Sequence, residues 1–244
     1  MLIVDTRASR IAPILATGFA LLCGWVQLSA AGSAAQDFER VVTRFNTTAP
    51  PAYRAFRRLE AGSPDKDKIG WLEAWTEFRP GQPLKVEIVD EGGSEYVRNK
   101  ILRGMLNSER QLVANGKPLR AAIDANNYEL ADGGITEDGL QRVTLKATRK
   151  SEGIVNGSLF LEPEEGYVTR IEGRLVKSPS FWVHDVDVTW KFARIGGHVL
   201  PVEVSSLGKV RIYGRSMFRM VYDYVRVDGR PTGVRLNAAL RDEP

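Results

Sequence analysis

Apolar and polar positions alternate along the second half of the chain. From residue 182 to residue 192 the even-numbered positions are mostly apolar or aromatic, while the odd-numbered ones are mostly polar. A period of two residues is typical of a strand with one buried face. Similar stretches run from residue 167 to residue 229, joined by turns too short for a crossover helix. The pattern predicts a large, curved antiparallel sheet.

More strands are expected upstream of this region. Residues 69–79 and 84–91 alternate around the turn at Pro80 and Gly81, as two paired strands would. In all, about nine to eleven strands are expected from such patterns. The remaining ones are predicted at 126–130, 141–150, 153–162, 167–177, 181–195, 198–207, 210–213 and 217–227.

Two short helices are predicted ahead of the strands. Residues 36–45 place four apolar side chains in one stripe at the spacing of a helix. Residues 51–61 are expected to form a second helix, because their aromatic and basic positions separate onto different faces. Three arginines of this second helix are candidates for contact with anionic head groups: Arg54, Arg57 and Arg58.

The longest predicted helix spans residues 95–113. Its apolar positions recur at intervals of three and four residues, so one face is suited to cover the sheet. Gly104 weakens this helix by about 1 kcal/mol relative to alanine and is expected to allow a close approach to the sheet. The fold class is therefore α+β, with about three helices packed on one large sheet.

The first 35 residues have the features of a secretory signal peptide. Arg7 and Arg10 precede an apolar run at 11–28, which is followed by small residues at 29–35. Residues 36–244 are expected to be the mature chain and to form one domain. An uncleaved N-terminal anchor is the alternative, because the apolar run is close to the shortest length that spans a bilayer.

Composition excludes some functions. The chain has 34 basic and 30 acidic residues, a balance that does not favour nucleic acid as a partner. Its one cysteine, Cys23, lies within the predicted leader, so disulfides and thiol chemistry are not expected in the mature chain.

No catalytic group is predicted. The chain has two histidines, and no serine is surrounded by the G-x-S-x-G pattern of a nucleophile elbow. His184 is expected on the inner face of a strand, and Asp185 and Asp187 on the opposite face, which is a poor start for a zinc site. His198 is expected in a turn. Nucleotide-binding glycine motifs are absent as well, so no metal, cofactor or catalytic residue is predicted.

Large apolar side chains remain to be explained. They can form an ordinary core beneath the helices, or they can line a cavity for an acyl chain, and the sequence leaves both open. The candidates for such a cavity come from several predicted strands and from the long helix: Trp71, Trp75, Met105, Trp182, Val186, Val188, Trp190, Phe192, Phe218, Met220 and Tyr222.

The order of these elements resembles the superfamily of periplasmic lipoprotein carriers and lipoprotein-sorting proteins, which is called LolA-like. The likeness covers roughly residues 53–227. Four segments carry it: Glu73-Ala74-Trp75-Thr76-Glu77-Phe78, Glu91-Gly92-Gly93-Ser94 with Tyr96-Val97-Arg98, Asn127-Tyr128-Glu129-Leu130, and Gly196-Gly197-His198-Val199-Leu200-Pro201.

This resemblance implies an open half-barrel with helices over its concave face. It also implies a monomeric periplasmic protein that binds a lipid, a lipidated protein or peptide, or another hydrophobic molecule, without catalysis. One alternative is an envelope protein-interaction or stress-sensing module. Pro201 favours it, because a proline suits an edge or bulged strand, and an edge is where a partner strand can pair. A secreted hydrolase is the other alternative.

Overall fold

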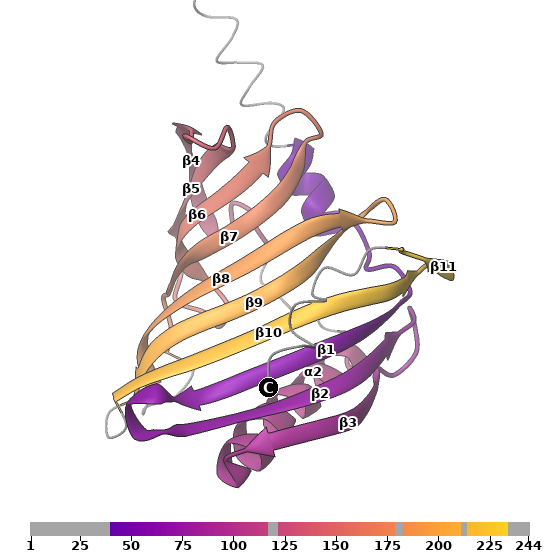
Figure 1. Ribbon diagram of the computed structural model, residues 1–244. Helices are drawn as coiled ribbons and strands as arrows, with labels where there is room; N and C mark the ends of the chain where they lie inside the picture. The colour runs from indigo at the N-terminus through magenta and orange to yellow at the C-terminus, as the bar shows by residue number, and fades with distance from the viewer. Residues whose placement is uncertain (1–39, 117–121, 179–182, 211–213, 234–244) are drawn as a thin grey trace, which may run out of the picture.

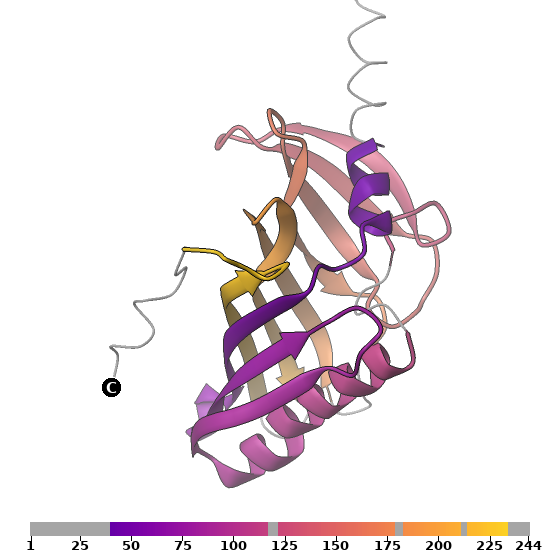
Figure 2. The ribbon, with the colours of Figure 1, turned by 90° about the vertical axis from the view of Figure 1, so that its right-hand side faces the viewer.

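The computed structural model describes residues 40–116, 122–178, 183–210 and 214–233. The predicted leader at 1–35 and the candidate Trp182 lie outside these ranges. The described residues form one large antiparallel sheet with helices on one side of it, as Figures 1 and 2 show. The sheet contains β1 (Tyr53–Ser63), β2 (Lys68–Phe78), β3 (Lys85–Gly93), β4 (Tyr128–Ile135), β5 (Gln141–Ala147), β6 (Val155–Glu162), β7 (Tyr167–Leu175), β8 (Val183–Ile195), β9 (His198–Val210), β10 (Gly214–Val227) and β11 (Arg230–Pro231).

The strand order makes the sheet open. Along the sheet the strands run β3-β2-β1-β10-β9-β8-β7-β6-β5-β4, with β11 beside β10. Strands β1 to β3 lie at one edge of the sheet, and β4 lies at the opposite edge. Strands β5 to β10 then follow one another back across the sheet, and β10 pairs with β1. Because β3 and β4 do not pair, the expected large antiparallel open sheet is confirmed.

The crossing from β3 to β4 contains the long predicted helix. It begins as a π-helical turn, η2 (Val97–Leu102), and continues as α2 (Arg103–Ala114). A second helix spans residues 40–47, and both lie on the concave side of the sheet (Figure 2). A single 3-10 turn, η1 (Pro64–Lys66), joins β1 to β2. None of the helices in the described ranges has the length and apolar character that crossing a membrane requires.

The helix predicted at 51–61 is wrong, and within the described ranges the count of about three helices over the sheet is not confirmed. This segment is β1, in which burial alternates with a period of two. Ala55, Arg57 and Leu59 face inward. The inward series contains an arginine, which concealed the alternation in the sequence, and pairing with β2 and β10 then fixed the extended backbone.

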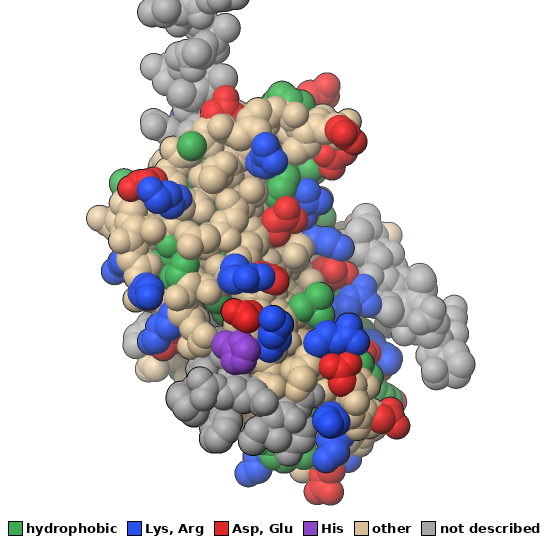
Figure 3. All heavy atoms as spheres, turned by 90° about the vertical axis from the view of Figure 1, so that its left-hand side faces the viewer, with side chains coloured by type: hydrophobic (Ala, Val, Ile, Leu, Met, Phe, Trp, Pro, Cys, Tyr) green, Lys and Arg blue, Asp and Glu red, His purple; other side chains and the backbone are tan. Residues whose placement is uncertain are grey.

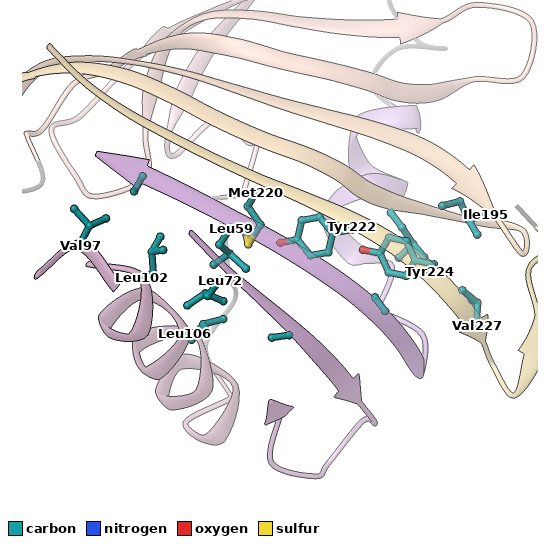
Figure 4. Close-up of a cluster of buried hydrophobic side chains, with 14 residues drawn as sticks. Leu59, Leu72, Val97, Leu102, Leu106, Ile195, Met220, Tyr222, Tyr224 and Val227 are labelled. Carbon is teal, nitrogen blue, oxygen red and sulfur yellow. The ribbon is translucent and has the colours of Figure 1, made fainter. Parts of the chain in front are cut away.

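Two apolar clusters hold the helices to the sheet. In the first, Leu102 of η2 and Leu106 of α2 pack towards Leu59 of β1 and Leu72 of β2, as Figure 4 shows. We call η2 and α2 together the lid. Met220, Tyr222 and Tyr224 of β10 share the inner face, as their spacing predicts. The second cluster joins strands β4 to β8 to Val42 of the N-terminal helix. Each cluster therefore packs one helical segment against one half of the sheet.

A bulge in β8 overturns the expected orientation of His184. Asp185 has a φ of 50°, and the register shifts between His184 and Asp187. His184 pairs with Lys209 and Asp187 pairs with Leu207, which puts both on one face. The His184 Nδ1 atom lies 3.3 Å from an oxygen of Asp185, so the two do not point apart as expected. The predicted alternation holds only beyond the bulge.

Pro201 does not lie at an edge. Strand β9 is in the interior of the sheet, between β8 and β10. The register shifts where Phe192 of β8 faces Pro201, so the proline is accommodated by a bulge. The argument for strand pairing with a partner at Pro201 therefore fails.

On the side of the molecule shown in Figure 3, acidic and basic side chains are interspersed.

Candidate functional site: an apolar cavity beneath the lid helix

A cavity of about 1310 Å³ lies between the sheet and the helices. Its walls come from three parts of the fold. These are the inner faces of β1 and β7 to β10, the lid formed by η2 and α2, and residues 41–51 at the N-terminal end. Because ligand pockets commonly measure about 300–1,000 Å³, this space is larger than most of them.

Apolar side chains form most of the lining. Phe45 of the N-terminal helix meets Phe192 of β8 edge to face, with ring centroids 5.2 Å apart. On the lid, Ile101 and Met105 are each 38% exposed, so the face towards the cavity is incompletely packed. The remaining apolar lining includes Val41, Leu59, Leu106, Leu112, Val168, Trp190, Leu200, Val204, Met220 and Tyr222.

Gly104 lies in the middle of the lid and lines the cavity. A Cβ atom built at this position would meet no atom within 4 Å. The glycine therefore makes no close approach to the sheet, contrary to the expectation from the sequence. Its missing side chain instead leaves open space under α2.

The cavity brings together five of the apolar candidates from the sequence. They are Met105, Trp190, Phe192, Met220 and Tyr222. Val186 and Val188 are buried in the second apolar cluster, and Phe218 packs against the first, so these three belong to the core and not to the cavity lining.

Trp71 and Trp75 do not reach the cavity. Their neighbours in β2, Leu72 and Ala74, are fully buried on the inner side, which leaves both tryptophans on the outer face. Trp71 covers Gly92 of β3, where a Cβ atom would come within 2.8 Å of the indole. The three arginine candidates from the sequence are divided in the same way. Arg54 and Arg58 stack on Trp75 and Trp71 at 4.8 Å, while Arg57 points inward.

Arg57 is the one charged side chain at the floor of the cavity that is almost completely buried, with 1% exposure. One of its terminal nitrogens, Nη2, donates to Glu109 Oε2 of the lid at 2.8 Å and lies 2.7 Å from the sulfur of Met220. The other, Nη1, lies 3.4 Å from Thr76 Oγ1. The Tyr222 ring covers the guanidinium at 4.8 Å. The sheet and the lid are thus joined by an ion pair inside an apolar site.

Three tyrosines surround this ion pair. Tyr222 and Tyr224 stack with ring centroids 5.8 Å apart, and Tyr53 meets Tyr224 edge to face. Desolvation raises the pKa of Tyr53 to about 12 and shifts the pKa of Tyr222 and Tyr224 upward as well. Burial alone would lower the pKa of Arg57, but the nearby tyrosines and Glu109 outweigh it. The net shift is upward, so the guanidinium stays charged.

A second set of ion pairs fastens the start of the lid. Glu91 of β3 accepts from Arg98 at 2.8 Å and from Arg103 at 2.6 Å. These arginines lie in η2 and at the first residue of α2, so the π-helical turn is held between them. π-helical turns are frequent at functional sites.

The end of the cavity near the N-terminal segment is more polar. Arg194 pairs with Glu165 at 3.0 Å, and His198 pairs with Asp228 at 2.9 Å. Asp228 also accepts from the backbone nitrogen of Ala52. These contacts hold the segment before β1 against the turn that follows β10. His198 therefore has a structural partner at the rim of the cavity.

Sequence reasoning missed several lining residues, Glu109 above all. In the predicted lid helix Glu109 is one of many polar residues, and nothing in the periodicity marks it. Leu59 was missed because β1 was taken for a helix. The alternation from Ala55 to Ala61 was the signal that could have placed both Arg57 and Leu59 on the inner face.

Within the described ranges, no three histidine, cysteine, aspartate or glutamate side chains are grouped so as to hold a metal ion. The fold and the cavity define an open antiparallel half-barrel with a lid. Family models and curated proteins give no match to the chain.

Two solved structures are similar in overall shape. A LolA superfamily protein from Nitrosomonas europaea is 11% identical, with a TM-score of 0.40, over 78% of this chain and 90% of that one. A DUF1329 family protein from Desulfovibrio piger is 9% identical, with a TM-score of 0.42, over 82% of this chain and 94% of that one. The first is from the superfamily that the sequence resembles.

Proposed function

We propose that this protein is a non-enzymatic periplasmic carrier or binding protein that holds a lipid, a lipidated peptide or another hydrophobic molecule in the cavity beneath α2. The observation that carries the proposal is the cavity itself, about 1310 Å³ in volume, with aromatic and aliphatic side chains on most of its walls. An empty apolar space of this size lowers the stability of a fold, because the side chains around it lose packing contacts. A bound apolar molecule would restore those contacts.

The energetics favour an acyl chain. Each methylene moved from water into an apolar site contributes about 0.8 kcal/mol, so a chain of ordinary lipid length contributes on the order of 10 kcal/mol before ordering costs are subtracted. The half-exposed Ile101 and Met105 of the lid would lose their remaining contact with water when such a chain binds. Methionine is suited to this role because its flexible side chain adapts to different ligand shapes.

Gly104 provides a direct test. Gly104→Phe is expected to place a ring in the open space under α2, and it should not weaken the helix, since glycine is a poor helix former. Displacement of a fluorescent fatty-acid analogue would be measured on the purified full chain. We expect binding by the original protein and a loss of about tenfold or more in the variant.

The matched control is Asn107→Phe, on the same helix but exposed and away from the cavity lining. This variant should bind the analogue as the original protein does. Failure of the original protein to bind any apolar probe would contradict the proposal. Equal binding by the Gly104→Phe variant would show that ligands do not use this cavity.

A further inference from the structure

Arg57 is an unusual residue to find in a cavity for an apolar ligand. Its side chain is 1% exposed, and removal of such an ion from water costs several kcal/mol. An apolar side chain on β1 would hold an acyl chain at least as well. A buried charge in a pocket is therefore a reason to look for a charged group that binds there.

The hydrogen-bonding capacity of Arg57 is not used up. A guanidinium has five N–H donors and pairs best with a carboxylate through two parallel hydrogen bonds. Glu109 supplies a single oxygen within hydrogen-bonding distance, and the other near neighbours are a thioether sulfur and a hydroxyl at 3.4 Å. Within the described residues the Nε–H group has no partner at all, although it is buried.

The carboxylate that Arg57 does hold belongs to the lid. Glu109 is on α2, whereas Arg57 is on the sheet, so the ion pair breaks when the lid lifts. The position of Glu109 Oε2, 2.8 Å from Nη2, shows where an anionic oxygen fits in this site. An incoming carboxylate can replace it or add to it at the free Nε.

Other basic side chains near the cavity are less suited to the task. Arg194 and His198 are paired with Glu165 and Asp228, and their side chains are 45% and 29% exposed. Arg44 and Lys100 lie at exposed positions of the lining. Charges that remain in water contribute little to the binding of an anion, because solvent and salt screen them.

From these observations we infer that Arg57 binds the carboxylate of a long-chain acid, which enters the cavity with its charged end innermost and lays its chain towards Phe45, Trp190 and Phe192. The inference rests on the proposed function and specifies its ligand class. The guanidinium lies under the Tyr222 ring and beside the sulfur of Met220, and its planar donor groups match the two oxygens of a carboxylate. Glu109 acts as an internal competitor for the same site.

Three probes of equal chain length test the inference: dodecanoate, dodecanol and dodecyl phosphate, each displacing the same fluorescent analogue at neutral pH. The original protein should bind dodecanoate about tenfold more tightly than dodecanol, since hydrogen bonds to charged groups contribute this much. In Arg57→Met the preference for the acid should disappear while dodecanol binds as before. In Glu109→Gln dodecanoate should bind several-fold more tightly, because the competitor is gone.

Two further variants serve as controls. Arg110→Met removes an exposed arginine from α2 and should leave all three affinities unchanged. Arg57→Met combined with Glu109→Gln removes both charges of the buried pair together, which costs less stability than the loss of one, and it should show no preference for the acid. An ion pair with a purely structural role would instead weaken all three probes in both single variants.

The outcomes separate the inference from the proposed function. Equal affinity of the original protein for dodecanoate and dodecanol overturns the role of Arg57 but leaves an apolar binding protein. Tighter binding of dodecyl phosphate than of dodecanoate overturns the choice of a carboxylate. Failure of all three probes to bind contradicts the proposed function itself.

Discussion

At the scale of single residues, the buried pair between Arg57 and Glu109 sets the chemistry of the cavity. The two side chains are 1% and 14% exposed, so solvent screens the pair weakly. Loss of one partner leaves the other as an uncompensated buried charge, which is costlier than the loss of both. The pair thus links the stability of the lid to the polarity of the cavity.

The first prediction concerns the stability of this pair. Glu109→Leu should lower the free energy of unfolding by about 3 kcal/mol, because the guanidinium stays buried without a counter-charge. Urea unfolding followed by tryptophan fluorescence would measure this. Adding Arg57→Met to Glu109→Leu should recover much of the loss, while Arg110→Gln, an exposed change on the same helix, should have almost no effect. A loss below about 0.5 kcal/mol in Glu109→Leu would show that the pair does not secure the lid.

The second prediction concerns alkaline pH. The pKa of Tyr53 in the folded protein is about 12, above its ordinary value of about 10. Folding therefore favours the protonated form, and this contribution to stability is fully present below about pH 10 and is lost as the pH rises to about 12. The urea concentration at the midpoint of unfolding should fall over this pH window. The absorbance of tyrosinate should also rise at a higher pH in the folded protein than in the unfolded chain. Midpoints that stay flat up to about pH 12 would rule out buried, neutral tyrosines around Arg57.

At the scale of elements, entry of a ligand into the cavity requires the lid to move. It contacts the sheet through Leu102 and Leu106 on one side, and it leaves Ile101 and Met105 half-exposed over the cavity. Glu91 holds the start of the lid by pairing with Arg98 and Arg103, and its side chain is 27% exposed. Such partly exposed pairs add little stability but can decide how often the helix opens.

The third prediction concerns the start of the lid. Glu91→Gln should change global stability by less than about 1 kcal/mol. It should raise hydrogen-exchange rates of the amides in residues 97–106 several-fold, because two fastenings of the π-helical turn are lost. Hydrogen exchange of the folded protein resolves this segment. Glu95→Gln, at an exposed position just before the lid, should leave the rates unchanged, and equal protection in both variants would show that Glu91 does not hold the start of the lid.

The fourth prediction separates the cavity wall from the core. Trp190 pairs with Ile171 and Val204 and faces the cavity, so part of its ring contacts empty space rather than protein. Trp190→Ala should therefore cost only about 1 to 2 kcal/mol, whereas Leu72→Ala, at a fully buried core position, should cost about 2 to 5. Chemical denaturation compares them. A larger cost at Trp190 than at Leu72 would mean that the ring is ordinary core.

The sequence predicted the elements with a strong period and missed those in which the pattern was mixed. The alternation in β8 beyond its bulge and in β10 was enough to put Trp190, Phe192, Met220 and Tyr222 on the inner face. Strand β1 was missed because Arg57 interrupts its apolar series. The Asp185 bulge could not be foreseen, because a left-handed residue at this point leaves no mark on the hydrophobic pattern.

At the scale of the whole molecule, the strand order explains how a cavity can exist. The sheet stays open because β3 and β4 are separate edges, and the chain that joins them carries the lid across the concave face. Sequence reasoning predicted the open sheet and its cover. It could not predict the volume between them, since that depends on how far apart two packed clusters hold the sheet and the helix, and no local pattern records this distance.

The fifth prediction concerns the cavity itself, which should carry a hydrophobic molecule. Native mass spectrometry would be performed on the protein purified without harsh detergent from the cells that produce it. We expect a population heavier than the polypeptide by the mass of one bound amphiphile, which solvent extraction removes and which is depleted in Gly104→Phe but retained in Asn107→Phe. Polypeptide mass alone in repeated mild preparations, or the same adduct at the same level in both variants, would contradict the account.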